Sequence, residues 1–171
     1  MDRTDPDTQA PELAMLGQFL DFHRATLVGK AAGLDREQLA RTHPPSTLTL
    51  IGLVKHAALN EDHWFGHIML GRPRAEPWAS APWDDDEDWE LTSAPGDDPA
   101  YVFGLYDDAC ARSRAALAEV GDLGTLSVNQ SRRTGERFSA RWIVLHMIEE
   151  TARHNGHADL LRESIDGVTG E

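Results

Sequence analysis

Cysteine and basic residues are both scarce in this sequence. Its only cysteine is Cys110, which excludes an intramolecular disulfide and fits a reducing compartment. Sixteen lysines and arginines stand against 29 aspartates and glutamates, so the formal net charge is −13. Binding to nucleic acid or to anionic lipid needs a basic face. The composition therefore argues against a nucleic-acid partner and against a membrane surface.

Long apolar runs and common catalytic motifs are also missing. No apolar run reaches the roughly 20 residues that a membrane span needs. The first residues, MDRTDPDTQAPE, are acidic and lack the apolar core of a secretion signal. The sequence has no serine nucleophile elbow, no phosphate-binding loop and no paired cysteine motif. We therefore expect a cytoplasmic protein outside these common enzyme classes.

What the sequence does contain is helical periodicity. A chain of 171 residues suits one domain with a real core, so we expect a single domain over residues 1–171 with a flexible N-terminus at 1–10. Capping signals and apolar spacing predict four long helices. They cover 11–33, a segment from Thr47 or Thr49 to Gly71, 99–121, and 139–165. The pattern predicts an all-α four-helix bundle, in which the long links after the first two helices allow a crossover.

Two links carry further expectations. A short helical turn, DREQLAR, follows the first helix, and residues 122–138 form a loop or an irregular hairpin. The longest link, residues 72–98, is rich in tryptophan and aspartate, and we expect it to be non-helical. Loops of this length are often functional. Either its tryptophans pin it across the bundle, or it forms a lid over a site.

Two polar residues interrupt the apolar stripe of the last predicted helix. Glu150 and His154 lie one turn apart within a stripe that contains Ile143, Met147, Ala158, Leu161 and Ile165. A carboxylate that faces a core is costly unless something pairs with it. Residues four apart on a helix point the same way, so a divalent metal held by both side chains would remove that cost.

A third metal ligand is expected on the second predicted helix. His56 lies at the edge of an apolar face built from Leu50, Leu53, Ala57, Trp64 and Ile68. Two imidazoles and one carboxylate would leave coordination positions open for water or substrate, which is typical of a catalytic rather than a structural site. We therefore predict that His56, Glu150 and His154 hold a divalent metal inside the bundle.

Other polar residues near these ligands have weaker assignments. Asn60 is one turn from His56 and is a candidate to orient a water or a substrate. His157 is a candidate for a general base or for support of the ligands. His63 and His67 should lie too far along the helix axis to join the site. His146 is expected to pack against a neighbour.

Two segments resemble a known superfamily. LIGLVKHAALNEDHWFGHIMLG in the second helix and RWIVLHMIEETARHNGHADLLRESIDG in the fourth are similar to the DinB-like four-helix bundles, and in particular to an actinobacterial branch of them. The resemblance runs from about Leu16 to Gly167. It implies a zinc- or nickel-like divalent metal held by one histidine of the second helix and by two residues four apart on the last. On this chain those residues are His56, Glu150 and His154.

Glu150 indicates which relatives within the superfamily this sequence resembles more specifically. Many relatives have histidine at the position of Glu150, whereas the mycothiol-dependent maleylpyruvate isomerases also have glutamate and histidine on the last helix. Those isomerases have an additional C-terminal domain for which these 171 residues have no room, so we expect a different reaction. Other relatives are S-transferases that use low-molecular-weight thiols such as mycothiol or bacillithiol.

The resemblance and the open coordination site together suggest a function. A metal with an open position lowers the pKa of a bound thiol or water, and a thiolate is the nucleophilic form. We therefore expect a metal-dependent transferase that activates a small thiol, such as mycothiol, for attack on an electrophile. The alternatives are a hydrolase that uses metal-activated water and a metal-binding module without turnover.

Three further expectations concern the surface and the cysteine. Trp142 and Leu145 lie off the metal stripe and are candidate contacts in a homodimer. Arg132 and Arg133 form a small basic spot that either meets an anionic thiol or is simply solvated. Cys110 should be a buried spectator in the third helix.

Overall fold

Capping residues determine where the long helices begin in the computed structural model, which describes residues 3–169. The Thr49 hydroxyl accepts a hydrogen bond from the Gly52 N–H at 3.0 Å, and the Ser139 hydroxyl accepts one from Trp142 N–H at 3.2 Å. Such caps satisfy backbone donors that the first turn leaves unpaired. The four long helices are α1 (Glu12–Ala31), α3 (Leu50–Glu61), α5 (Pro99–Val120) and α6 (Ala140–Asp166). They confirm the predicted four helices.

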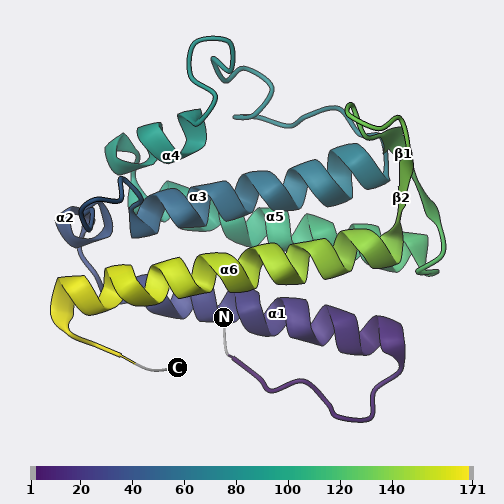
Figure 1. Cartoon of the computed structure of the whole chain (residues 1–171), viewed down its shortest axis with the longest axis horizontal. Coiled ribbons are helices and arrows are strands. Elements are labelled where there is room, and N and C mark those ends of the chain that lie inside the picture. The colour runs from purple at the N-terminus through teal and green to yellow at the C-terminus, as the bar shows by residue number, and fades with distance from the viewer. Residues whose placement is uncertain (1–2, 170–171) are drawn as a thin grey trace.

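The long helices pack as a bundle with one crossover. Helix α1 packs along α6, α3 packs along α5, and α3 also contacts α6. Figure 1 shows that α3 and α5 run in one direction while α1 and α6 run in the other. The link from α3 to α5 is therefore a crossover connection, whereas the other links join antiparallel helices. This arrangement confirms the all-α class.

The core consists of two apolar clusters. The larger one lies mainly between α3 and α5 and includes Leu53, Val54, Val102, Tyr106 and Cys110, all essentially inaccessible to solvent. The smaller one joins the N-terminal half of α6 to the end of the second helix. A buried ion pair, Arg24 to Glu61 at 2.5 Å, ties α1 to α3. Each charge is costly to bury alone, so the two stabilise the fold only as a pair.

The second predicted helix changes its geometry halfway. Regular α-helix ends at Glu61, and η1 (Asp62–Met69) continues as a π-helix before Gly71 ends the segment. The wider π turn changes the direction in which successive side chains point. The sequence predicted a uniform helix up to Gly71, because its apolar spacing alone does not distinguish the two geometries.

The first two links contain short helices. Helix α2 (Arg36–Leu39) has a capping box made by Asp35 and Gln38, as the DREQLAR turn predicted. The prediction of a non-helical 72–98 link was wrong, because α4 (Trp89–Ser93) and the 3₁₀ turn η2 (Ala94–Gly96) lie in it. The Lys55 ammonium stabilises this part by donating to Ser93 and Asp97 at 2.7 and 2.6 Å.

Tryptophans attach the 72–98 link to the bundle. Trp78 is 1% exposed, and its indole N–H donates to Asp62 at 3.0 Å. Trp83 donates to the Trp78 carbonyl, and Trp89 packs edge-on against both rings. The Lys55 ammonium lies 4.0 Å from the centre of the Trp89 ring. These contacts support the interpretation that the tryptophans pin the link across the bundle.

A two-stranded hairpin connects α5 to α6. Strands β1 (Leu126–Gln130) and β2 (Arg137–Ser139) pair antiparallel with an irregular register. The hairpin lies against η1, where Asn129 donates to the His67 carbonyl at 2.8 Å. Gly71 has φ +67°, and a Cβ there would lie 2.6 Å from the Val128 side chain. Only glycine allows this close approach without strain.

Two further features of the described residues are the lack of a membrane-spanning helix and the path of the N-terminal segment. Within residues 3–169, no helix is long and apolar enough to cross a bilayer. The predicted flexible N-terminus includes residues 1–2, which lie outside the described residues. The following segment contacts α1, since the Asp7 N–H donates to the Gln18 side chain at 2.8 Å.

Candidate metal centre

Helices α3 and α6 bring three metal-capable side chains together. His154 Nε2 lies 3.1 Å and His56 Nε2 lies 3.6 Å from the same oxygen, Glu150 Oε1. The two imidazole rings are 4.9 Å apart between centres and nearly perpendicular. One ligand atom from each residue lies within 4.8 Å of the other two. Residues 94 positions apart in the sequence thus meet at one point.

The cluster lies at the partly exposed edge of the α3–α6 contact rather than in the core. The side chains of His56, Glu150 and His154 are 20%, 24% and 15% exposed. The buried α6 positions at this level are Thr151 and Asn155. The sequence placed Glu150 and His154 within the apolar stripe, and the structure places them at its edge. A partly solvated position lowers the cost of an ionised carboxylate and leaves the site accessible to small molecules.

Glu90 in α4 fixes the orientation of His56. Its carboxylate, 4% exposed, accepts a hydrogen bond from His56 Nδ1 at 2.7 Å. With the proton on Nδ1, the Nε2 lone pair points at Glu150. A carboxylate behind a histidine is a common support for metal ligands. The sequence analysis missed Glu90, which lies in an acidic stretch where only its apolar neighbours, Trp89 and Leu91, distinguish it.

The surroundings of the cluster shift the pKa values of all three residues. They favour an ionised Glu150 and make His56 more basic than His154. Burial lowers the pKa of His56, but the hydrogen bond and charge of Glu90, together with Glu150, raise it above the ordinary value. Burial and the neighbouring His56 lower the pKa of His154. For Glu150, burial raises the pKa, but His154 and His56 outweigh it and the net pKa is lowered.

Asn60 and His157 both contact the cluster. The Asn60 amide nitrogen lies 3.0 Å from His56 Nε2 and 3.5 Å from Glu150 Oε1. His157 Nδ1 lies 3.4 Å from His154 Nδ1 on the opposite side of that ring from Glu150. Asn60 is therefore beside the ligand atoms that face the opening, whereas His157 contacts the site only through His154.

The remaining sequence candidates lie elsewhere. Of the described residues, only His56, Glu150 and His154 form a metal-capable group, so His63 and His67 are outside it. His146 packs against the ring of Trp142 at 5.0 Å, as expected. Cys110 is fully buried, and burial raises the pKa of its thiol to about 12. The cysteine therefore does not supply a thiolate at neutral pH.

The donor set fits a divalent cation. His56 Nδ1 donates to Glu90, and a proton on His154 Nδ1 would face His157. In these tautomers the Nε2 lone pairs of both histidines and Glu150 Oε1 face one another. The Asn60 amide reaches two of these acceptors, His56 Nε2 and Glu150 Oε1, but none of the described donors reaches all three, and a cation between them would satisfy them together. Two imidazoles and a carboxylate are a common ligand set for Zn²⁺ and related ions.

Comparison with known proteins agrees with this geometry. No curated protein matches the sequence significantly. A protein-family model described as Mycothiol-S-transferase matches residues 15–167, which span all four long helices and every residue of the metal-capable group. The match agrees with the DinB-like resemblance of the second and fourth helices. The chain therefore belongs to the mycothiol S-transferase family.

Proposed function

We propose that the protein is a metal-dependent transferase that activates a low-molecular-weight thiol, with mycothiol as the best candidate. The observation that carries this proposal is the convergence of His56, Glu150 and His154 in a member of this family. These three residues would hold a zinc or nickel ion. With an open coordination position, such an ion lowers the pKa of a bound thiol and so supplies the nucleophilic thiolate at neutral pH.

The protein supplies orientation and charge around that ion. Glu90 holds His56 in the tautomer whose Nε2 faces the cluster. Glu150 contributes one negative charge, and a second, Glu90, lies directly behind His56. Both carboxylates would favour a divalent cation. Because the cluster is only partly exposed, these interactions are stronger than they would be in water.

Asn60 and His157 have separate proposed roles. Asn60 lies beside two ligand atoms and lines a hollow that opens to solvent, so its amide can hydrogen-bond to a thiol substrate and orient it. His157 is half-buried and contacts His154. Because it reaches the cluster only through His154, we assign it to steadying that ring or to accepting the thiol proton by way of His154. Substituting Asn60 should raise KM for the thiol, whereas a base at His157 would affect kcat and its pH dependence.

Two further parts of the proposal concern setting and partners. The second substrate is a small electrophile, which would be transferred to the thiol sulfur. A small-thiol cosubstrate is kept reduced in the cytoplasm, and the buried lone cysteine is compatible with that compartment. We therefore propose a cytoplasmic role in detoxification or group transfer.

Thiol consumption tests the proposal directly. The purified protein is incubated with mycothiol and monobromobimane, with added Zn²⁺ or Ni²⁺ and with a chelator. We expect conjugate formation above background that the chelator abolishes and that His154→Ala lowers by at least about 100-fold. His43→Ala, at an exposed histidine, is the control. No metal-dependent rate with any of mycothiol, bacillithiol or glutathione would refute the transferase.

A further inference from the structure

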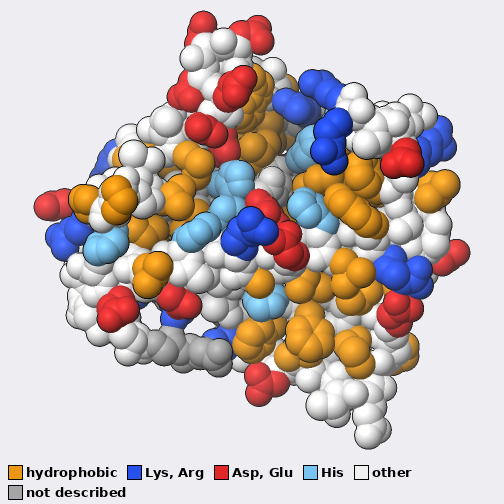
Figure 2. Space-filling view, in the orientation of Figure 1, with side chains coloured by type: hydrophobic (Ala, Val, Ile, Leu, Met, Phe, Trp, Pro, Cys, Tyr) orange, Lys and Arg blue, Asp and Glu red, His pale blue; other side chains and the backbone are white. Residues whose placement is uncertain are grey.

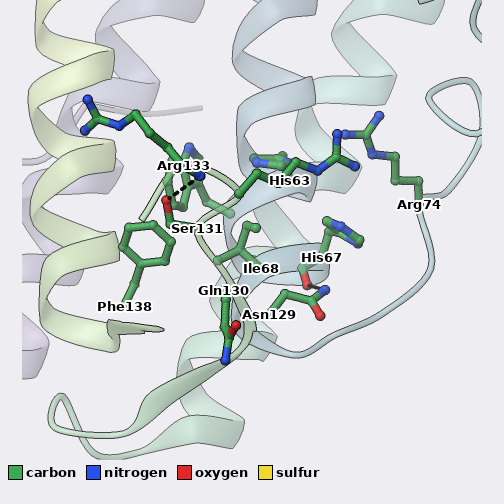
Figure 3. Close-up of a pocket in the computed structure, with 11 residues that line it drawn as sticks. His63, His67, Ile68, Arg74, Asn129, Gln130, Ser131, Arg133 and Phe138 are labelled. Carbon is green, nitrogen blue, oxygen red and sulfur yellow. Dashed lines mark hydrogen bonds between the residues drawn. The ribbon is translucent and has the colours of Figure 1, made fainter. Parts of the chain in front are cut away.

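A groove beside the metal-capable group is lined by basic residues. It has a volume of about 530 Å³ and lies between η1 and the hairpin. His63 and His67 come from η1, Arg74 comes from the following link, and Arg132 and Arg133 come from the hairpin. Figure 3 shows Arg74 and His63 on one side of the groove and Arg133 and Phe138 on the other.

The groove shares residues with a second hollow that reaches Asn60, next to the metal-capable group. A second hollow of about 340 Å³ is lined by Asn60, His63, Arg74 and Arg132. Asn60 contacts His56 and Glu150, while the other three residues also line the groove. Asn60 therefore links the metal-capable group to a hollow that also reaches Arg74 and Arg132, so a small molecule that occupied both would span from the group to the two arginines.

The groove arginines have charges that the protein does not neutralise. Among the described residues, no carboxylate lies within ion-pair distance of Arg74, Arg132 or Arg133, and all three are exposed. The one acidic residue that shares the second hollow is Glu87. The chain has a net charge of −13, so a groove with three unpaired arginines is a positively charged region on an otherwise acidic protein. Figure 2 shows Lys and Arg side chains beside the histidines on this face.

The walls of the groove are held in place. Asn129 and the close approach at Gly71 fix the hairpin against η1. His67 Nδ1 lies 3.1 Å from the Arg72 carbonyl oxygen, to which it donates. Burial, together with the positive charges of Arg74 and Arg132, lowers the pKa of His63 to about 4. His63 is therefore neutral at pH 7, and the arginines supply the positive charge of the groove.

We propose that this groove binds an anionic group, a carboxylate or a similar oxyanion, on the electrophilic substrate. Guanidinium groups suit planar oxyanions because they present paired N–H donors. Mycothiol itself has no free carboxylate, because its N-acetylcysteine is joined through the carboxyl group to a sugar amine. The anion that the groove fits therefore belongs to the electrophile. This assignment rests on the proposed transferase function, but binding of an anion can be tested without turnover.

Succinate, an unreactive dicarboxylate, tests binding at the groove. In a two-dimensional ¹H–¹⁵N titration at low ionic strength, we expect saturable shifts confined to residues near 63–74 and 129–133. The double variant Arg74→Gln/Arg132→Gln should lose them. Arg137→Gln is the matched control, because Arg137 is in the same hairpin but lines neither hollow. Shifts that persist in the double variant, or that occur elsewhere on the surface, would overturn the proposal.

Two electrophiles that differ in charge test the role of the groove in the reaction. Iodoacetate and iodoacetamide both alkylate a thiol: the S–C bond forms, the C–I bond breaks, iodide leaves with the electron pair and the thiol proton passes to solvent. In the double variant we expect KM for iodoacetate to rise roughly fivefold to tenfold, as for loss of solvent-exposed ion pairs. Values for iodoacetamide, and for both substrates with Arg137→Gln, should be unchanged.

The two experiments separate this inference from the transferase proposal. Equal effects on both electrophiles, or an effect on KM for mycothiol alone, would overturn the assignment of the anion to the electrophile. If neither electrophile reacts, the transferase proposal fails, and the succinate titration still decides whether the groove binds anions. If both react equally in every variant, the transferase proposal stands and the groove assignment fails.

Discussion

Glu90 accepts a hydrogen bond from Nδ1 of His56 at 2.7 Å, although the two residues are 34 positions apart in the chain. This contact joins the crossover link to the metal-capable group. Lys55 in turn fixes α4 through Ser93 and through the ring of Trp89. The link therefore does more than cover the bundle, because it also determines which nitrogen of His56 faces Glu150.

Loss of this carboxylate should weaken metal binding without unfolding the protein. Glu90→Gln keeps the size and removes the charge, and we expect the affinity for Zn²⁺ to fall roughly tenfold, as for other residues that orient metal ligands. Competition with a chromophoric chelator measures the change. Asp85→Asn, an exposed acid in the same link, is the matched control. Equal affinities for the two variants would show that Glu90 does not support the site.

The affinity for metal should depend on pH through one histidine. The pKa of His56 is raised by Glu90 and Glu150 against the effect of burial, whereas the pKa values of His154 and Glu150 are lowered. Below the raised pKa of His56, the metal must displace one proton. Log affinity should therefore rise with a slope of about one and level off at a pH above 6.5, the ordinary histidine value. A slope of about two would contradict this assignment.

Local signals in the sequence were enough to predict the helices. Thr49 and Ser139 act as caps, and Gly121 and Gly167 end α5 and α6 with positive φ. These features depend on neighbours within a few residues, so the sequence shows them. The grouping of His56, Glu150 and His154 was predicted from helical spacing together with the DinB-like resemblance, and the structure brings the three side chains together.

Long-range contacts explain what the sequence did not reveal. The burial of Glu90 and Lys55 depends on α4 docking onto α3. The pair of Arg24 with Glu61 joins residues 37 positions apart, and each of them resembles a surface charge when read alone. His63 and His67 lie in the π-helix η1 and line the groove together with Arg74, which comes from the following link. Spacing along one helix cannot predict such meetings.

His63 should make the protein sensitive to acid. Its pKa in the folded protein, about 4, lies below the 6.5 of an ordinary histidine. The unfolded chain therefore takes up the proton first as the pH falls, so this stability is complete above pH 6.5 and is lost between 6.5 and 4. We expect His63→Asn to reduce the drop in unfolding free energy from pH 7 to pH 4.5 by about 1–2 kcal/mol. Chemical denaturation of both proteins at pH 7 and pH 4.5 measures these unfolding free energies.

The control for this prediction is a histidine that the fold does not enclose. His43 is exposed in the link before α3, and His43→Asn should leave the acid sensitivity of the wild type unchanged. If the unfolding free energy of the His63→Asn protein falls as much as that of the wild type between pH 7 and pH 4.5, other groups cause the acid sensitivity.

The exposed apolar residues of α6 predict self-association. Trp142 and Leu145 are 45% and 48% exposed, and Phe19 on the adjacent α1 is 42% exposed. If a second copy covers this surface, Leu145→Glu should convert a dimer to a monomer in sedimentation velocity at micromolar concentration. Tyr101→Glu, an equally exposed site at the start of α5, should leave the dimer intact. A wild-type protein that stays monomeric at every concentration would contradict the dimer.

Metal content tests the central claim most directly. Elemental analysis of protein purified in parallel should find about one zinc or nickel ion per wild-type chain, the number that a single three-ligand site holds. We expect this metal to be lost in His56→Ala, Glu150→Ala and His154→Ala and to be kept in His67→Ala, whose side chain lies outside the metal-capable group. Equal metal content in all five proteins, or none in the wild type even after addition of Zn²⁺ or Ni²⁺, would contradict the account.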